Sequence, residues 1–220
     1  MSQYELNINN YDDTEIILKK STKSNFKWLN KLEDLEKFQN LAYENIGVRF
    51  PISFLKNSQT VAAIDKYGKM YGGFVFAGYK DSRVISSLSS DAMQTLKTKF
   101  PDYKNSVFEI TGLWLSASER SKMNNIKFWS KLCDEISKID RPNFIYAYSS
   151  SKPQLAKLYS AAKPQRIFQG ITKVLPGMTK PDDEVIEIGS VKSCHLAWIM
   201  KTSYRYRKII KKHSHRKNHA

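Results

Sequence analysis

One carboxylate, Glu109, lies inside an otherwise apolar run of β-forming residues, Val107–Leu115. Strict alternation along a strand would place Glu109 on the same face as Val107, Thr111 and Leu113. Burying a carboxylate is costly unless it is paired or protonated, and burial raises its pKa toward values that suit a general base. The pattern predicts either a base that takes a proton from an acceptor amine or a structural ion pair with a neighbouring strand.

The elements that must position Glu109 alternate between strands and helices. After residues 107–115 the sequence predicts a polar loop over 116–124, a helix from Asn125 to about Ile139, a strand over 143–148, a helix over 153–162 and a strand over 166–175. Two strands joined through a helix are expected to pair in parallel. A helix N-terminus that opens between such strands offers free N–H groups to anionic or carbonyl groups, which is what an acyl-thioester donor requires.

The rest of the chain supplies further strands and helices. We expect strands within residues 1–24, the clearer at Thr14–Lys20, a helix over 30–46 that ends at Gly47, a hairpin over 59–79, a helix over 90–99, a strand over 184–188 and an apolar run over 195–200. Gly72 and Gly73 in the hairpin predict a bulge or a close backbone contact. No repeat or linker divides the chain, so we expect one domain over 1–200 and a tail over 201–220.

Composition narrows the class of protein. The chain has 220 residues, 41% of them hydrophobic and 12% aromatic, which favours a folded globule. It contains no run of 18 apolar residues and no signal-peptide pattern, so we expect a cytoplasmic protein without a membrane span. The two cysteines, Cys133 and Cys194, fit a reducing compartment better than a disulfide scaffold, although a disulfide between them stays an alternative. The four histidines show no metal-ligand spacing, and we expect no metal.

The positive charge is concentrated at one end. The net charge is +15, and residues 201–220 hold eight Lys or Arg and no acid. The other 200 residues carry 28 basic and 21 acidic side chains, a net charge of +7. Such a tail can bind nucleic acid or an acidic protein, or it can be a solvated terminus.

The order strand–helix–hairpin–strand–helix–strand–helix–strand, over about residues 30–188, resembles the GNAT (GCN5-related N-acetyltransferase) fold. The resemblance implies an α+β fold with a mixed, mostly antiparallel twisted sheet and helices on both faces. It implies that a central parallel strand pair splays to form the donor cleft. It also implies that the central strand and the loop after it bind the pantetheine and pyrophosphate of the donor.

The donor loop departs from the family's signature, Arg/Gln-x-x-Gly-x-Gly/Ala. Arg120 is retained, but Met123 and Asn125 replace the two glycines. Side chains at these positions obstruct the close approach of backbone N–H groups to a pyrophosphate. Such degenerate loops resemble two branches of the family. One is the acyl-carrier-dependent branch, with acyl-homoserine-lactone synthases and N-acyl amino acid synthases. The other comprises phage Mom-type proteins that modify adenine in DNA.

Short motifs keep both branches open. Glu109-Ile110-Thr111 resembles the Glu-x-Ser/Thr-Arg pattern of the first branch, with Gly112 in place of the arginine. Leu113-Trp114-Leu115 and Phe168-Gln169-Gly170 resemble the Mom pattern, whose aspartate near Ser150 is absent. Neither branch is matched completely.

The resemblance also implies roles for individual residues. Glu109 would be the base, and Tyr159 would protonate the leaving thiolate unless it serves only in packing. Backbone groups near Leu115 to Ala117 would bind the pantetheine arm and polarise the thioester carbonyl. The expected donor-binding residues are Leu115, Ser116, Ala117, Arg120, Ser121, Lys122 and Asn125, with Arg120 and Lys122 near phosphate oxygens or in a solvated loop.

These observations predict a GNAT-like N-acyltransferase. It would move an acyl group from acyl-CoA or from an acyl-carrier protein (acyl-ACP), a phosphopantetheine thioester, to an amine. The positive charge suits an acidic acyl-carrier protein as partner, because complementary charge raises encounter rates. One alternative is a Mom-like enzyme that engages nucleic acid through the basic tail. Another is an inactive GNAT scaffold that acts as a basic binding module.

Overall fold

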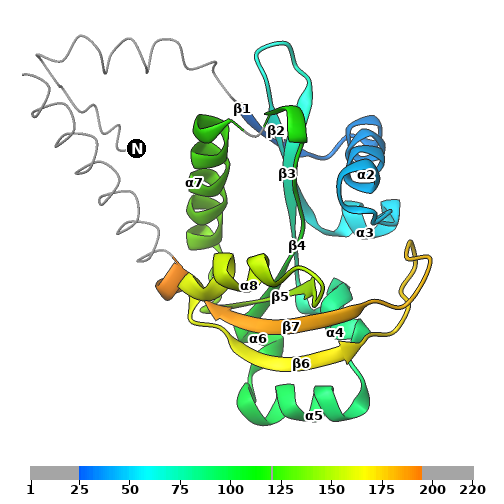
Figure 1. The fold of residues 1–220 in the computed structure, drawn as a ribbon, viewed down its shortest axis with the longest axis vertical. Coiled ribbons are helices and arrows are strands. Elements are labelled where there is room, and N and C mark those ends of the chain that lie inside the picture. The colour runs from blue at the N-terminus through cyan, green and yellow to red at the C-terminus, as the bar shows by residue number, and fades with distance from the viewer. Residues whose placement is uncertain (1–24, 120, 195–220) are drawn as a thin grey trace, which may run out of the picture.

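The computed structural model describes residues 25–119 and 121–194, which form one seven-stranded sheet with strand order β1-β2-β3-β4-β5-β7-β6 (Figure 1). The strands are β1 (Asn25–Leu29), β2 (Gln59–Ile64), β3 (Met70–Ala77), β4 (Val107–Leu115), β5 (Asn143–Ser149), β6 (Gln165–Ile171) and β7 (Asp183–Ser190). Only β4 and β5 pair in parallel. The predicted mixed, mostly antiparallel sheet is confirmed. Arg120, the predicted strand Thr14–Lys20 and the predicted tail lie outside the described residues.

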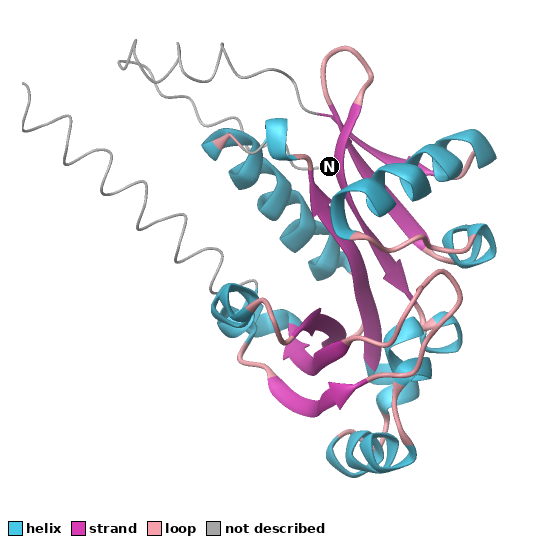
Figure 2. Cartoon of the chain, turned by 45° about the vertical axis from the view of Figure 1, so that its right-hand side comes forward, coloured by secondary structure: helices cyan, strands magenta, loops and turns pink. Residues whose placement is uncertain are grey.

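Helices cover both faces of this sheet, as predicted (Figure 2). They are α2 (Leu32–Ile46), α3 (Ile52–Asn57), α4 (Arg83–Ser87), α5 (Ser90–Lys99), α6 (Tyr103–Ser106), α7 (Lys122–Lys138) and α8 (Pro153–Tyr159), with 3-10 turns η1 (Tyr79–Asp81), η2 (Ala117–Glu119) and η3 (Ser160–Ala162). Helices α7 and α8 pack on one face, which we call the α7 face. Helices α2 to α5 pack on the other, which we call the α4 face.

The hairpin β2–β3 forms as the sequence predicts, and its glycines allow close packing. A methyl group at Gly73 would overlap the ring of Phe38 from α2, and one at Gly72 would lie 2.8 Å from the side chain of Leu115. The register between β3 and β4 shifts just after Gly73. The predicted close backbone contact is therefore confirmed, and it brings α2 directly onto the middle of the sheet.

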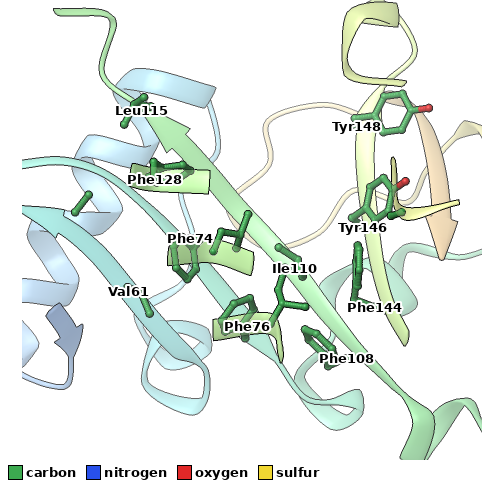
Figure 3. Close-up of a cluster of buried hydrophobic side chains, with 14 of the residues drawn as sticks. Val61, Phe74, Phe76, Phe108, Ile110, Leu115, Phe128, Phe144, Tyr146 and Tyr148 are labelled. Atoms are coloured by element: carbon green, nitrogen blue, oxygen red, sulfur yellow. The ribbon is translucent and has the colours of Figure 1, made fainter. Parts of the chain in front are cut away.

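The parallel pair β4–β5 is short. It joins Val107 to Asn143, Phe108 to Phe144 and Glu109 to Ile145, and it ends there. Figure 3 shows Phe108 and Phe144 side by side, with ring centroids 6.1 Å apart, whereas Leu115 and Tyr148 at the far ends of the two strands lie well separated. The predicted splay of the central strands is confirmed, and Glu109 lies in the last residue pair before they part.

A bulge in β4 changes which side chains share a face with Glu109. Thr111 and Trp114 pair with Val75 and Gly73, so β4 has one more residue than β3 between these points. Gly112 in this stretch has a positive φ of 61°, a conformation typical of a bulge that begins with glycine. Leu113 consequently packs on the α7 face. The expectation that Leu113 shares a face with Glu109 is wrong, because the bulge interrupts the alternation.

Candidate active site

Side chains from both faces of the sheet line one cavity of about 500 Å³ at the place where β4 and β5 part. Glu109 and Arg83 line it from the α4 face, and Trp129 and Leu132 of α7 line it from the other side. The cavity passes between two strands that no longer pair. It corresponds to the cleft that the resemblance implies between the splayed strands.

Glu109 is fully buried, and the structure holds only one of its two oxygens. Its Oε2 accepts hydrogen bonds from the hydroxyl of Ser82 at 2.7 Å and from the backbone N–H of Val84 at 3.0 Å. Its Oε1 has no partner within the described part of the chain. Burial raises the pKa of Glu109, and the bonds from Ser82 and Val84 and the charge of Arg83 oppose that rise. A cavity-lining carboxylate that is fixed through one oxygen, with no hydrogen bond to the other, suits a general base.

Further charged groups surround Glu109. We call this part of the cavity, lined by Arg83, Glu109, Asp182 and Glu184, the polar limb. The guanidinium of Arg83 donates to the backbone carbonyl of Pro176 at 2.8 Å. Burial lowers the pKa of Arg83, whereas Glu109 and Glu184 act in the opposite direction. Burial also raises the pKa of Glu184. The polar limb can therefore bind a small acceptor that carries polar or charged groups.

The cavity has a different lining beside α7. We call this part the apolar limb; it is lined by Ile126, Trp129, Leu132, Ile136 and Phe144, with the thiols of Cys133 and Cys194 in its wall. The four α7 residues recur every three or four positions, as expected for one face of a helix. Leu132, Ile136 and Phe144 also belong to the buried cluster of the α7 face, of which Figure 3 labels Phe144. The apolar limb can hold an extended hydrocarbon chain and offers little to an ion.

Tyr159, the second predicted catalytic residue, lines the same cavity from the end of α8. Its ring centroid lies 4.7 Å from that of Tyr146 and 5.7 Å from that of Tyr148. Burial, with a smaller contribution from Tyr148, raises the pKa of Tyr159 to about 12. The hydroxyl of Tyr146 is already engaged, because it donates to Glu187 at 2.9 Å. The Tyr159 hydroxyl thus stays protonated at neutral pH.

The predicted donor-binding residues lie at the end of β4 and the start of α7. Leu115 ends β4, Ser116 and Ala117 follow, and Ser121 is the N-cap of α7. The N–H of Ser116 donates to the carbonyl of Tyr71 at 2.7 Å, so it serves the sheet rather than a substrate carbonyl. A role for the other backbone groups of this segment in polarising that carbonyl stays a prediction.

Helix α7 begins three residues earlier than predicted, so Lys122 and Asn125 are helical. The reason is the cap, in which the hydroxyl of Ser121 accepts the N–H of Asn124 at 3.1 Å. The amide of Asn124 in turn donates to the Glu119 carboxylate at 3.2 Å. Among the predicted donor-binding residues whose side chains are described, Asn125 alone lines the cavity.

Sequence reasoning missed two residues at this site, one that contacts Glu109 and one that lines the polar limb. Ser82 lies 27 positions before Glu109, and Glu184 comes from β7. Neither lies in a motif; the fold alone brings Ser82 to the Glu109 carboxylate and Glu184 to the cavity wall. A weak signal was present for Ser82, because Ser, Thr, Asp and Asn favour helix N-caps, and Ser82 caps α4 by accepting the N–H of Ile85.

No group of three His, Cys, Asp or Glu side chains within 25–119 and 121–194 could hold a metal ion. In the same residues, no helix is both long and apolar enough to cross a membrane.

The mixed sheet and the splayed parallel pair are those of the GNAT fold, and comparison with solved structures confirms this fold. FeeM, an N-acyl amino acid synthase from uncultured soil microbes, matches with a TM-score of 0.55 and 11% identity over 79% of this chain and 94% of that one. The AHL synthase LasI matches with a TM-score of 0.56 and 8% identity over 81% of this chain and 95% of that one.

An acetyl-CoA complex of NAA60 from Arabidopsis thaliana is also similar, with a TM-score of 0.53 and 13% identity over 77% of this chain and 99% of that one. The sequence itself matches no family profile and no curated protein. At these identities the comparisons establish the fold of the chain.

Proposed function

We propose that this protein is an N-acyltransferase that moves an acyl group from a thioester to an amine. The observation that carries the proposal is the buried Glu109, which lines a cavity between the splayed strands and whose Oε1 has no hydrogen-bond partner among the described residues. A carboxylate with a raised pKa at that place is poised to accept a proton from an amine. Solved structures with the same fold include an N-acyl amino acid synthase and an acetyl-CoA complex, which supports this class of reaction.

The proposed reaction uses the two predicted catalytic residues. Glu109 takes a proton from the acceptor nitrogen, whose lone pair forms a bond to the thioester carbon. The C–S bond then breaks, and the sulfur leaves as a thiolate. A phenol with a pKa of about 12 holds its proton more firmly than a thiol of pKa about 8.5. Tyr159 therefore acts chiefly by donating a hydrogen bond to the leaving sulfur.

The apolar limb supports a donor with a hydrocarbon acyl chain rather than an acetyl group alone. It is lined by aliphatic and aromatic side chains, and it joins the polar limb in the same cavity. Each methylene that leaves water for such a site contributes about 0.8 kcal/mol. A chain of several carbons placed there would hold the thioester carbonyl near Glu109, where the strands part.

The start of α7 supports a carrier-bound donor over acyl-CoA. The cap uses the N–H of Asn124, and the carboxylate of Glu119 contacts the side chain of Asn124. A pyrophosphate at this end would compete with the Ser121 hydroxyl for the N–H and would approach the Glu119 charge. An acyl-carrier protein presents phosphopantetheine without the nucleotide pyrophosphate. The net charge of +15 favours encounter with an acidic carrier.

The cavity gives less support to nucleic acid. Glu109, Asp182 and Glu184 line it together with Arg83 and Lys152, so carboxyl groups outnumber basic ones among its described residues. A phosphate backbone needs the opposite balance. The basic tail, the other basis of the nucleic-acid alternative, lies outside the described residues.

The test is a donor-by-acceptor matrix with purified protein. The donors are dodecanoyl-ACP, dodecanoyl-CoA and acetyl-CoA, and the acceptors are amino acids and polyamines. Release of free thiol and the mass of the product are measured together. We expect amine-dependent thiol release, faster with dodecanoyl than with acetyl donors and faster with ACP than with CoA. The absence of amine-dependent release from every donor would contradict the proposal.

A further inference from the structure

Two cysteines far apart in the sequence meet in the wall of the cavity. Cys133 lies in α7, and Cys194 lies 61 positions later, four residues after the end of β7. Their sulfur atoms are 3.9 Å apart, both are free thiols, and both line the cavity. Neither has a part in the proposed reaction. Because two thiols in contact can be oxidised to a disulfide, this pair is a candidate redox site.

The surroundings of the two thiols differ. Cys133 is buried, whereas Cys194 is half-buried and packs against the buried cluster that contains Leu132 and Ile136. The two thiols form one hydrogen-bonding contact, in which either sulfur can be the donor. The contact with Cys194, together with burial, raises the pKa of Cys133. Because Cys194 is the more exposed of the two thiols, a dissolved oxidant reaches it first, and Cys133 is placed to complete the bond.

We propose that Cys133 and Cys194 are a redox-active dithiol whose oxidation to a disulfide narrows the apolar limb and so reduces acyl transfer from long-chain donors. The part that concerns transfer rests on the proposed function, whereas formation of the disulfide does not.

The oxidant is a small-molecule disulfide such as oxidised glutathione. The Cys194 thiolate attacks one sulfur of the oxidant, which forms a mixed disulfide and releases one glutathione thiolate. The sulfur of Cys133 then attacks the sulfur of Cys194 and releases the second glutathione. Two S–H bonds and one S–S bond break and one S–S bond forms, while two electrons and two protons pass to glutathione.

Disulfide formation must bring the two sulfurs in the wall of the apolar limb closer together. Bonded sulfurs lie about 2.05 Å apart, so the present separation of 3.9 Å has to shrink by nearly half. Helix α7 is a 17-residue element packed along the sheet. The segment with Cys194 is held at its start, where the N–H of Val191 donates to the carbonyl of Pro142 at 3.0 Å. Cys194 lies three residues beyond this contact, so we expect its sulfur, rather than helix α7, to move when the bond forms.

Binding of a long acyl chain and formation of the disulfide should then disfavour one another. If the disulfide narrows the apolar limb, a long acyl chain binds the reduced protein better than the oxidised protein. Thermodynamic linkage requires that the same chain favour the reduced protein by the same factor. A bound dodecanoyl chain should consequently slow or prevent disulfide formation, whether or not transfer follows.

The experiment compares each protein with its own reduced state. Wild type and Cys194→Ser are reduced with dithiothreitol and then treated with oxidised glutathione, and intact mass after alkylation counts the remaining thiols. We expect wild type to lose two hydrogen atoms and both alkylation sites. Its rate with dodecanoyl donors should fall about 15-fold, equivalent to losing the burial of two methylenes, while the acetyl rate changes less than about twofold. Dithiothreitol should restore the rate, and Cys194→Ser should not respond.

A second measurement separates this proposal from the proposed function. The rate of disulfide formation is followed by mass with and without dodecanoyl-CoA as the probe, and no turnover is needed. Protection by dodecanoyl-CoA supports the redox site even in a protein without transferase activity. Glutathione adducts without an internal disulfide would overturn the proposal. So would a disulfide that does not change the preference for dodecanoyl over acetyl donors and that forms equally fast with and without dodecanoyl-CoA. Cys194→Ala replaces Cys194→Ser if the serine variant does not fold.

Discussion

The polar limb and the apolar limb are parts of one cavity, yet their linings differ: charged, hydrogen-bonded side chains line the first and apolar side chains the second. In the polar limb, Glu109 receives two hydrogen bonds on one oxygen, Glu184 accepts the hydroxyl of Thr172 at 2.8 Å, and Arg83 donates to a backbone carbonyl. In the apolar limb the lining side chains are aliphatic or aromatic, apart from the two thiols. The short parallel pairing of β4 and β5 allows this contrast, because the opening beyond Glu109 joins the two faces of the sheet.

The contrast suggests how the two limbs divide the work. Charge must develop at the junction, where an amine attacks a thioester, and an apolar neighbour strengthens electrostatic interactions there. The apolar limb can fix the donor without competing for the hydrogen bonds of Glu109. Each limb can therefore be perturbed alone, and the two should fail in different ways.

The largest effect is expected in the polar limb, from Glu109→Gln. The amide oxygen can still accept from Ser82 and Val84, but the side chain cannot take a proton. We expect kcat/KM to fall about 10²- to 10⁴-fold for every donor, regardless of chain length. Glu184→Gln is the matched control, an identical chemical change in the same limb, and its loss should be less than about tenfold. Wild-type turnover by Glu109→Gln would exclude Glu109 as the base.

The same variant has a signature in stability. Burial raises the pKa of Glu109 in the folded protein above the unfolded value of about 4.3, so the folded state binds more protons between those two values. The free energy of unfolding that Glu109 contributes is then present below about pH 4.3 and falls as pH rises through the folded pKa. Gln does not titrate. The difference in Tm between Glu109→Gln and wild type should therefore shift in favour of the variant as pH rises from about 4 to 7.

The next effect should appear in the apolar limb and depend on chain length. Leu132→Phe adds volume to the wall, and each methylene that it excludes should lower kcat/KM roughly fourfold, the equivalent of about 0.8 kcal/mol. Dodecanoyl donors should therefore lose activity while acetyl donors keep it. Leu132→Met, which nearly conserves volume, is the control. An equal loss for both donors would indicate a general defect and would break the contrast between the limbs.

Tyr159→Phe tests the hydroxyl group of the second predicted catalytic residue, which lines the same cavity from the end of α8. Thiolates leave readily, so loss of one hydrogen bond to the sulfur should reduce kcat about tenfold for long and short donors alike. Because the pKa of Tyr159 is about 12, the variant should keep the pH profile of wild type between about pH 6 and 9. Tyr148→Phe, which removes a hydroxyl from a neighbouring ring, is the comparison. A wild-type kcat for Tyr159→Phe would leave Tyr159 a packing role only.

Local sequence patterns were enough to predict many of the helices and strands. Periodicity gave α2, and Gly47 ends that helix in the left-handed conformation. The strand–helix–strand order gave the parallel pair β4–β5. The elements that periodicity missed, such as α4 and β1, are only five residues long, too short for a repeat to be visible.

The site itself depended on contacts that no local pattern encodes. The bulge at Gly112 turned Leu113 to the opposite face because one glycine has a positive φ. Ser82 reaches Glu109 only through the packing of α4 on the sheet, and Cys133 reaches Cys194 only after β5, β6 and β7 are in place. Glu109 could be selected from the sequence because a carboxylate is unusual inside an apolar strand. Its partner Ser82 is not unusual in its own segment, so the sequence did not draw attention to it.

The smallest effect, and the sharpest test of the polar limb, is expected from Ser82→Ala. The Ser82 hydroxyl donates to Oε2 of Glu109 at 2.7 Å, and this bond favours the ionised carboxylate. Without it the pKa of Glu109 should rise further. Because the ionised form is the active base, the acid limb of the kcat/KM profile should move to higher pH, while the rate at the high-pH plateau changes less than about threefold.

Ser82 also caps α4, so part of the effect of Ser82→Ala is a loss of stability of about 1 kcal/mol. Ser89→Ala supplies the matched control, because Ser89 caps α5 by accepting the N–H of Ala92. Both variants should lose similar Tm, but only Ser82→Ala should shift the pH profile. If the pH profiles of both variants coincide with that of wild type, the Ser82 hydroxyl does not affect the pKa of Glu109. A shift confined to Ser82→Ala would show that the Ser82 hydroxyl, in addition to burial, helps to set the pKa of Glu109.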